Sequence, residues 1–74
     1  MFRMPTEREI ARIRSAYPAG TRVTLVSMED PYTTLKPGDQ GTVQGVDDAG
    51  QIMMRWDNGS SLSLIPGEDS FRRV

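Results

Sequence analysis

The chain has 74 residues, with nine basic and ten acidic side chains, a formal net charge of −1, and neither cysteine nor histidine. This composition excludes a disulfide framework, a thiol nucleophile and a Cys/His zinc site, and the length suits one small domain. Because no apolar run approaches the roughly 20 residues of a membrane span and the first residues lack the apolar centre of a signal peptide, we expect a cytoplasmic protein with no membrane partner.

A short helix is predicted over residues 6–16. Thr6 is a suitable N-cap, and Glu9, three residues later, completes a capping-box pattern. Pro18 disfavours helical geometry at the residue before it, which ends the helix. We treat residues 1–19 as an N-terminal helical arm. Its apolar stripe consists of Ile10, Ile13 and Tyr17.

The helix admits two interpretations. In the first, its apolar stripe packs against the rest of the domain, as is usual for a short amphipathic helix. Alternatively, Arg8 and Arg12, four residues apart on the polar face, contact a partner or a nucleic acid.

Alternating apolar and polar residues then predict a meander of short antiparallel strands. The predicted strands are residues 21–28, 41–46, 51–56 and 60–64, followed by an edge strand at 71–73. A polar loop, Glu29 to Lys36, separates the first two. The residues expected to be buried are Val23, Leu25, Val43, Ile52, Met54, Trp56, Leu62 and Leu64.

Glycines mark the irregular positions of this meander. Gly45 inside the second strand indicates a bulge or sharp bend. Gly50 can supply a positive φ in the hairpin that follows. Asn58-Gly59 is the strongest hairpin signal, and it predicts a type I′ turn in which Gly59 has positive φ.

Five short strands, a long first loop, tight later hairpins and a turn before the last strand together resemble the SH3-like barrel. Several motifs also resemble a family of small SH3-like proteins of unknown function from Gram-positive bacteria, their phages and conjugative elements. They are Asp30-Pro31-Tyr32-Thr33, Pro37-Gly38-Asp39-Gln40-Gly41-Thr42-Val43, Val46-Asp47-Asp48, Trp56-Asp57-Asn58-Gly59-Ser60-Ser61-Leu62 and Leu64-Ile65-Pro66-Gly67-Glu68-Asp69. The resemblance covers about residues 17–71. It implies a mainly β fold, a small five-stranded SH3-like barrel over residues 20–74 with one N-terminal α-helix, and it implies no activity.

Charge is unevenly distributed along the chain. Residues 1–22 contain five arginines and two glutamates, a net of +3, whereas residues 23–71 contain two cations and eight acids, a net of −6. Phosphate-backbone binding depends on Lys and Arg, so the acidic body is a poor nucleic-acid surface.

No pattern of catalytic residues is present. Without His or Cys only carboxylates remain for acid–base work, and Asp47 and Asp48 fall on a hairpin tip where water screens them. These two acids and Asp57 also lack the spacing of an EF-hand loop. We therefore expect no enzyme activity, no cofactor and no metal site.

A binding groove is predicted between the first long loop and the later hairpins, by analogy with SH3-like folds. Trp56 has two interpretations, because its alternation places it in the core while an indole at the rim would anchor a partner. The candidate partner-binding residues are Asp30, Tyr32, Asp47, Asp48, Trp56, Asp57 and Asn58.

Three functional hypotheses follow. The first is a non-enzymatic protein-binding module encoded by a phage or mobile element, an inhibitor or adaptor that docks its acidic surface on a host system such as a defence nuclease. The second is a nucleic-acid accessory protein that uses the arginines of the N-terminal helix. The third is an oligomeric sponge for a nucleotide signal, with Arg8, Arg12 and Arg55 as phosphate contacts. The sequence leaves the oligomeric state open.

Overall fold

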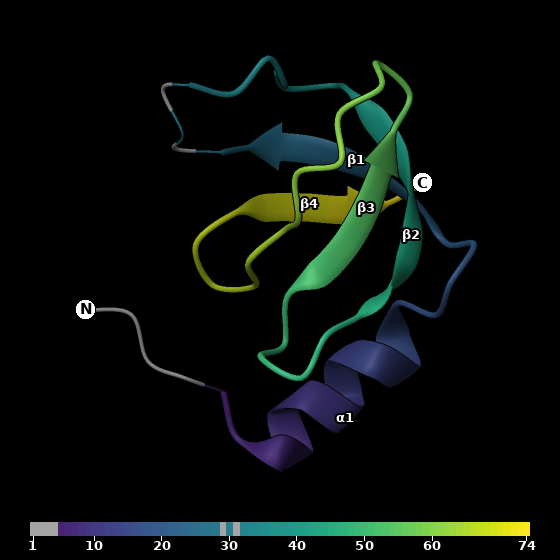
Figure 1. The fold of residues 1–74 in the computed structure, drawn as a ribbon, viewed down its shortest axis with the longest axis vertical. Helices are drawn as coiled ribbons and strands as arrows, with labels where there is room; N and C mark the ends of the chain where they lie inside the picture. Colours follow the sequence, from purple (N-terminus) through teal and green to yellow (C-terminus); the bar gives the residue numbers. More distant parts are fainter. Residues whose placement is uncertain (1–4, 29, 31) are drawn as a thin grey trace.

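One helix and four antiparallel strands make up the computed structural model, which describes residues 5–28, 30 and 32–74. The helix is α1 (Glu7–Ala16), and the strands are β1 (Arg22–Ser27), β2 (Gln40–Val46), β3 (Ile52–Trp56) and β4 (Ser70–Arg73). They form a single sheet of order β3-β2-β1-β4 (Figure 1). The mainly β prediction is confirmed. Residues 1–4 of the predicted arm, and Glu29 and Pro31 of the predicted loop, lie outside the described residues.

The helix begins and ends where the sequence predicts. The side chain of Thr6 accepts a hydrogen bond from the backbone amide of Glu9 at 3.1 Å, which satisfies one of the free amides of the first turn. Ile10 is buried, and Ile13 and Tyr17 pack against the edge of the core. The apolar stripe therefore holds α1 against the sheet, where its nearest strand is β2. No helix in the described part of the chain is long and apolar enough to cross a membrane.

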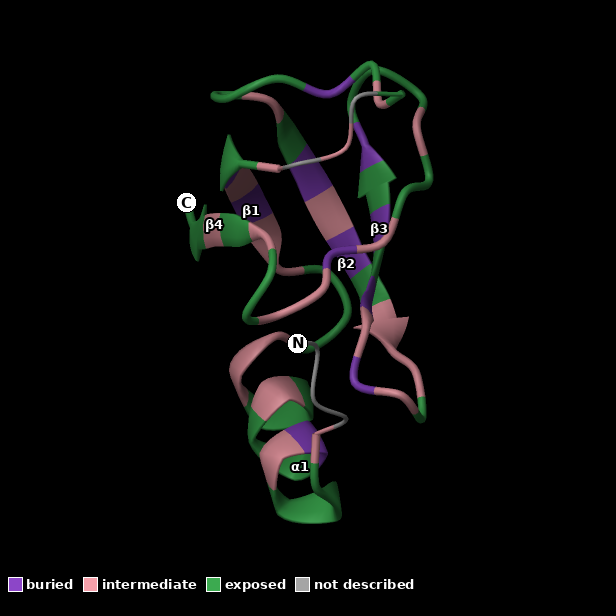
Figure 2. Cartoon of the chain, turned by 90° about the vertical axis from the view of Figure 1, so that its left-hand side faces the viewer, coloured by how far each residue is buried: buried purple, intermediate pink, exposed green. Residues whose placement is uncertain are grey.

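The core lies on one face of the sheet. Buried and exposed positions alternate along β2 and β3, as Figure 2 shows by colour. Seven of the eight residues predicted to be buried are buried, and Trp56 is the largest, at 1% exposure. Leu62 is the exception at 36% exposure, so that prediction is wrong.

The fourth predicted strand, residues 60–64, does not form in the described structure. Only Leu64 makes a bridge, to Ile52 of β3. At the middle of the segment, the indole of Trp56 donates to the carbonyl of Leu62 at 2.8 Å, and the hydroxyl of Ser60 accepts from the amide of Leu62 at 3.2 Å. Both backbone groups of Leu62 are thus bonded to side chains, and such local bonds compete with a sheet ladder. The sheet consequently stays open, and the five-stranded barrel is not formed.

The Asn58-Gly59 turn differs from the predicted type. Gly59 has φ of +94°, as expected, but no described residue other than glycine has positive φ, so Asn58 cannot occupy the first left-handed position of a type I′ turn. The amide of Gly59 donates to the carbonyl of Trp56, and the amide of Trp56 donates to Ser60, each at 2.9 Å. This is the three-residue hairpin loop in which a left-handed glycine follows an ordinary turn.

The bulge predicted at Gly45 is confirmed. The register between β2 and β3 shifts between Val43 and Gly45. Gly50, at φ +84°, also meets its prediction, and a side chain there would collide with Pro5, since its Cβ would lie 2.9 Å from the proline ring. The hairpin at residues 47–50 therefore packs closely on the start of α1.

Candidate functional site

Tyr32 lines a shallow groove of about 420 Å³. Its ring is 93% exposed, the highest value among the large apolar and aromatic side chains described. The groove is lined by Met28, Asp30, Tyr32, Leu62, Ser63, Ile65, Glu68 and Asp69. Three of these eight residues are acids and three are aliphatic or thioether side chains, so an apolar floor meets an acidic rim.

Short hydrogen bonds fix the acids that border this groove. The carboxylate of Asp30 accepts from the backbone amide of Tyr32 at 2.9 Å, which sets the direction of the loop at the tyrosine. On the other wall, the carboxylate of Asp69 accepts from the amide of Ile65 at 2.8 Å and closes the turn between them. Glu68 forms no side-chain hydrogen bond within the described residues, and it is exposed. Its carboxylate is therefore available to a ligand.

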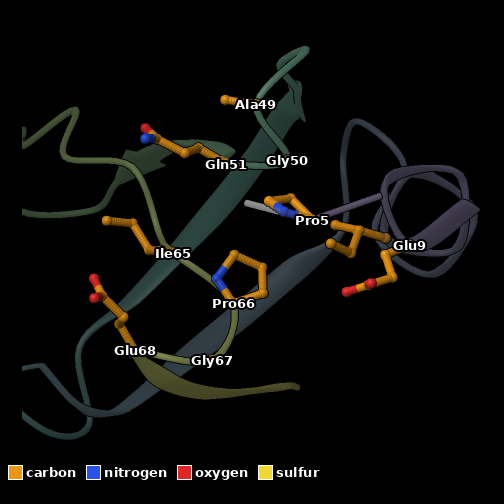
Figure 3. A pocket seen from close by; sticks show the side chains of 10 residues that line it. Pro5, Glu9, Ala49, Gly50, Gln51, Ile65, Pro66, Gly67 and Glu68 are labelled. Carbon is orange, nitrogen blue, oxygen red and sulfur yellow. The ribbon is translucent and has the colours of Figure 1, made fainter. Parts of the chain in front are cut away.

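A second hollow of about 450 Å³ adjoins the first (Figure 3). It lies between the start of α1, the hairpin at residues 49–51 and the turn at residues 65–68. Pro5 and Pro66 stand near its centre, with Glu9 and Glu68 on opposite sides. Its lining residues are Pro5, Glu9, Ile13, Ala49, Gly50, Gln51, Ile65, Pro66, Gly67 and Glu68. Ile65 and Glu68 line both hollows, so the two are neighbours, and we call them together the acidic groove.

Acidic side chains predominate among the described residues of the acidic groove. Four carboxylates line it, and the described lining residues include no lysine or arginine. Exposed like charges gathered in a concave surface raise the local potential and attract groups of opposite sign. The four acids are Asp30, Glu9, Glu68 and Asp69.

Two of the acids predicted to bind a partner are paired with arginines instead. Both terminal guanidinium nitrogens of Arg22 donate hydrogen bonds to the carboxylate of Asp57, at 2.8 and 2.6 Å. Arg14 forms an ion pair with Asp48 at 3.0 Å. The hydrogen bonds from Arg22, reinforced by the opposite charge, hold the pKa of the Asp57 carboxyl below its ordinary value, and they raise the pKa of Arg22 in turn. The charge of each of these acids is therefore largely neutralised within the fold.

Two more of the predicted residues have a local structural role. One carboxylate oxygen of Asp47 accepts from the amides of Ala49 and Gln51, at 3.0 and 2.8 Å, and so shapes the hairpin. The side-chain oxygen of Asn58 accepts from the amide of Ser60 at 2.9 Å, which stabilises the hairpin loop. These contacts explain the residue types without a ligand.

Trp56 belongs to the core and is not among the lining residues of the acidic groove. Its 1% exposure and its bond to Leu62 agree with the alternation of β3. Of the predicted site, the structure therefore places only Asp30 and Tyr32 together in the acidic groove.

The candidate phosphate contacts do not lie together. Arg8 and Arg12 are exposed on α1, whereas Arg55 is exposed on β3 and lines a different hollow. Within the described part of the chain, none of the three forms an ion pair. A nucleotide site that uses all three would need a second subunit.

The described residues contain no group of three acids placed to hold a metal ion.

The far wall of the acidic groove was missed from the sequence. Ile65, Glu68 and Asp69 follow the last core residue, Leu64, and were interpreted as a connector. A signal was nevertheless present, because Pro66-Gly67 predicts a turn and the two acids directly after it would be displayed on its surface.

The sequence was also compared with known proteins. No curated protein matches it. Residues 6–74, almost the whole chain, match a family described as a domain of unknown function, DUF4314. The protein therefore belongs to the DUF4314 family.

Proposed function

We propose that this protein is a non-enzymatic binding module that holds a basic segment of a partner protein in the acidic groove. The observation that carries the proposal is the composition of the groove at Tyr32, where a 93% exposed aromatic ring stands beside apolar and acidic residues with no cation among them. Tyrosine is enriched among the residues that dominate protein–protein affinity. An exposed apolar floor with a polar rim is typical of such contacts.

The shape of the groove favours an extended segment. Its two hollows lie next to each other and share Ile65 and Glu68, so a segment long enough to reach both would pass over these two residues. Successive side chains of an extended chain point in opposite directions. Basic residues of such a segment would therefore meet the carboxylates, and the apolar residues between them would cover Leu62 and the ring of Tyr32.

The wider setting is part of the same proposal. We infer an SH3-like fold whose fourth barrel strand has opened, which the pairing of β4 with β1 supports. An origin in a phage or mobile element of Gram-positive bacteria then fits an inhibitor or adaptor of a host protein. A host defence nuclease is one such target, because its basic nucleic-acid channel is complementary to an acidic groove.

Nucleic-acid binding is the second candidate, and one observation favours it. Arg8 and Arg12 are exposed on α1 and form no ion pair within the described residues. Two unpaired guanidinium groups four residues apart suit contacts to neighbouring phosphates.

The experiment that tests the proposal is peptide binding followed by fluorescence anisotropy. The probe is an extended peptide in which lysine alternates with leucine, and the same peptide with glutamine for lysine is its uncharged control. We expect Tyr32→Ala to weaken binding of the lysine peptide about tenfold. Glu68→Gln should weaken it about threefold, and more at low salt than at high salt.

Glu7→Gln is the matched control, since it removes one exposed carboxylate outside the acidic groove. It should leave peptide affinity within twofold of the wild type. Equal effects of the Glu7 and Glu68 variants, or unchanged affinity in Tyr32→Ala, would contradict the proposed site. Tight binding of duplex DNA that is lost in Arg8→Glu with Arg12→Glu would favour the second candidate instead.

A further inference from the structure

A third hollow, of about 650 Å³, lies beside β3 and the segment at residues 60–64 that does not form the predicted strand. Backbone hydrogen bonds tie the segment from Ser60 to Leu64 to β3 at its two ends, whereas at its centre the indole of Trp56 donates to the carbonyl of Leu62. The three serines of the segment border the hollow. The hollow is lined by Gln44, Met53, Met54, Arg55, Trp56, Asp57, Gly59, Ser60, Ser61 and Ser63.

The hydrogen-bond donors of this hollow have few partners within the protein. Arg55 is exposed and forms no ion pair or hydrogen bond in the described part of the chain. The hydroxyls of Ser61 and Ser63 likewise have no partner there. The oxygen of Ser60 accepts from the amide of Leu62, so its own hydrogen is still free to be donated.

The one carboxylate that borders the hollow is already neutralised. Asp57 accepts two hydrogen bonds from Arg22, at 2.8 and 2.6 Å, and Arg22 also donates to Thr42 at 3.0 Å. The charges of Arg22 and Asp57 cancel at short range. The charge of Arg55 is therefore left uncompensated beside three hydroxyl groups.

We propose that this hollow binds the oxyanion of a small phosphate monoester, with Arg55 and the hydroxyls of Ser60, Ser61 and Ser63 as its ligands. A guanidinium group and several neutral donors are the set that recognises phosphate oxygens. The volume is within the range of small-molecule sites. Met53, which is 41% exposed in the same wall, supplies an apolar surface for the organic part of the ester. Ser63 borders both this hollow and the acidic groove, whereas Arg55, Ser60 and Ser61 line only this hollow.

The test is a titration followed by the backbone amide resonances of ¹⁵N-labelled protein at constant ionic strength. The three probes are inorganic phosphate, a nucleoside monophosphate and the matching nucleoside without phosphate. We expect the first two to shift the amides of residues 55 and 59–63 and the nucleoside to leave them unchanged. Tighter binding of the monophosphate than of phosphate supports a contact with Met53, and equal binding supports free phosphate as the ligand.

Arg55→Gln should weaken binding of the monophosphate at least tenfold, and Arg55→Lys should restore part of it. Arg72→Gln is the matched control, because Arg72 is also an exposed, unpaired arginine of the sheet but lies on β4. Ser61→Ala with Ser63→Ala should weaken binding threefold or more, whereas Ser70→Ala should not. These exposed positions leave the core untouched, and a thermal melt checks that each variant is folded.

Three results would overturn the proposal. One is an equal loss of affinity for the monophosphate in the Arg55 and Arg72 variants, which would mean that any exposed positive charge attracts the phosphate. Another is binding of the nucleoside as tightly as its monophosphate. The third is a shift pattern centred on Arg8 and Arg12 of α1. Each is independent of whether a peptide binds in the acidic groove.

Discussion

Gly41→Ala tests the close approach of β2 and β3. Gly41 pairs with Trp56 across the two strands. A methyl group at this glycine would lie 2.9 Å from Cε3 of the indole, 3.0 Å from the carbonyl oxygen of Arg55 and 3.0 Å from Cα of Trp56. Comfortable carbon contacts are about 3.5–4.0 Å. Two of the three clashing atoms are backbone, so β3 itself must move.

The expected cost follows from these contacts. Overpacking that displaces backbone costs about 1–3 kcal/mol, and the upper half of that range applies because no flexible side chain can give way. Alanine recovers about 0.5–1 kcal/mol of the strand entropy that glycine loses. The net loss is therefore about 2 kcal/mol, out of the roughly 4–11 kcal/mol typical of a 74-residue domain. The melting temperature should fall by about 8–16 °C.

The assay is urea unfolding followed by the fluorescence of Trp56, whose burial makes it a reporter of the core. Gly59→Ala is the comparison, since nothing lies within 4 Å of its added methyl group and only the positive φ of +94° opposes it. That strain costs about 1 kcal/mol. If Gly41→Ala were as stable as the wild type, or more stable than Gly59→Ala, the conclusion that β2 and β3 lie too close together at Gly41 to admit a methyl group would be wrong.

Three further outcomes are expected. Thr6→Ala should lower the free energy of unfolding by about 1 kcal/mol, measured by urea titration, because it removes the cap on the amide of Glu9. Trp56→Phe should cost about 2 kcal/mol in the same titration, since the carbonyl of Leu62 loses its indole donor and the core loses volume. The ion pair of Asp57 should stabilise the protein above the carboxyl's ordinary pKa of 3.8 and lose this effect as the pH falls through the lowered folded value. Melting curves from pH 6 to pH 2 should therefore show a shallower acid decline for Asp57→Asn, and an identical decline would refute the contribution of the pair.

Local sequence patterns predicted most of the fold. The cap at Thr6, the alternation of the first three strands and the bulge at Gly45 each depend on residues close together in the chain. The last edge strand was also predicted, and it forms as β4 against β1. Periodicity and turn chemistry act over this short range, which is why they sufficed here.

The predicted strand at residues 60–64 does not form, for a reason that the alternation of apolar and polar residues cannot show. The segment from Ser60 to Leu64 has a strand pattern, but the fate of Leu62 is decided by two side chains, the indole of Trp56 and the hydroxyl of Ser60. The predicted type I′ turn does not form either. Here too a side chain bonds to the backbone, because the side-chain oxygen of Asn58 accepts from the amide of Ser60 in the three-residue loop. Competition between side chains and backbone partners is visible only once the segments are placed in space.

The candidate site was harder to predict than the fold, because it depends on which charges find a partner. Asp48 and Asp57 looked like a free acidic rim, yet their partners, Arg14 and Arg22, are more than thirty positions away in the sequence. Exposed ion pairs of this kind contribute little to stability, but they remove charge from a surface. Composition gives the number of acids and cannot say which remain unpaired.

The distribution of unpaired charge is what separates the two proposed surfaces. Lys36 also forms an ion pair with Asp39, at 3.5 Å. The net charge of −6 on residues 23–71 therefore overstates the negative charge that most of the sheet presents to solvent. Of the four described acids of this segment that form no ion pair, Asp30, Glu68 and Asp69 line the acidic groove and Asp47 does not. The hollow beside Arg55 has the opposite sign and lies across the segment that failed to become a strand. Since a basic peptide and a phosphate oxyanion would each be repelled by the other surface, one small domain can keep the two ligands apart by charge alone.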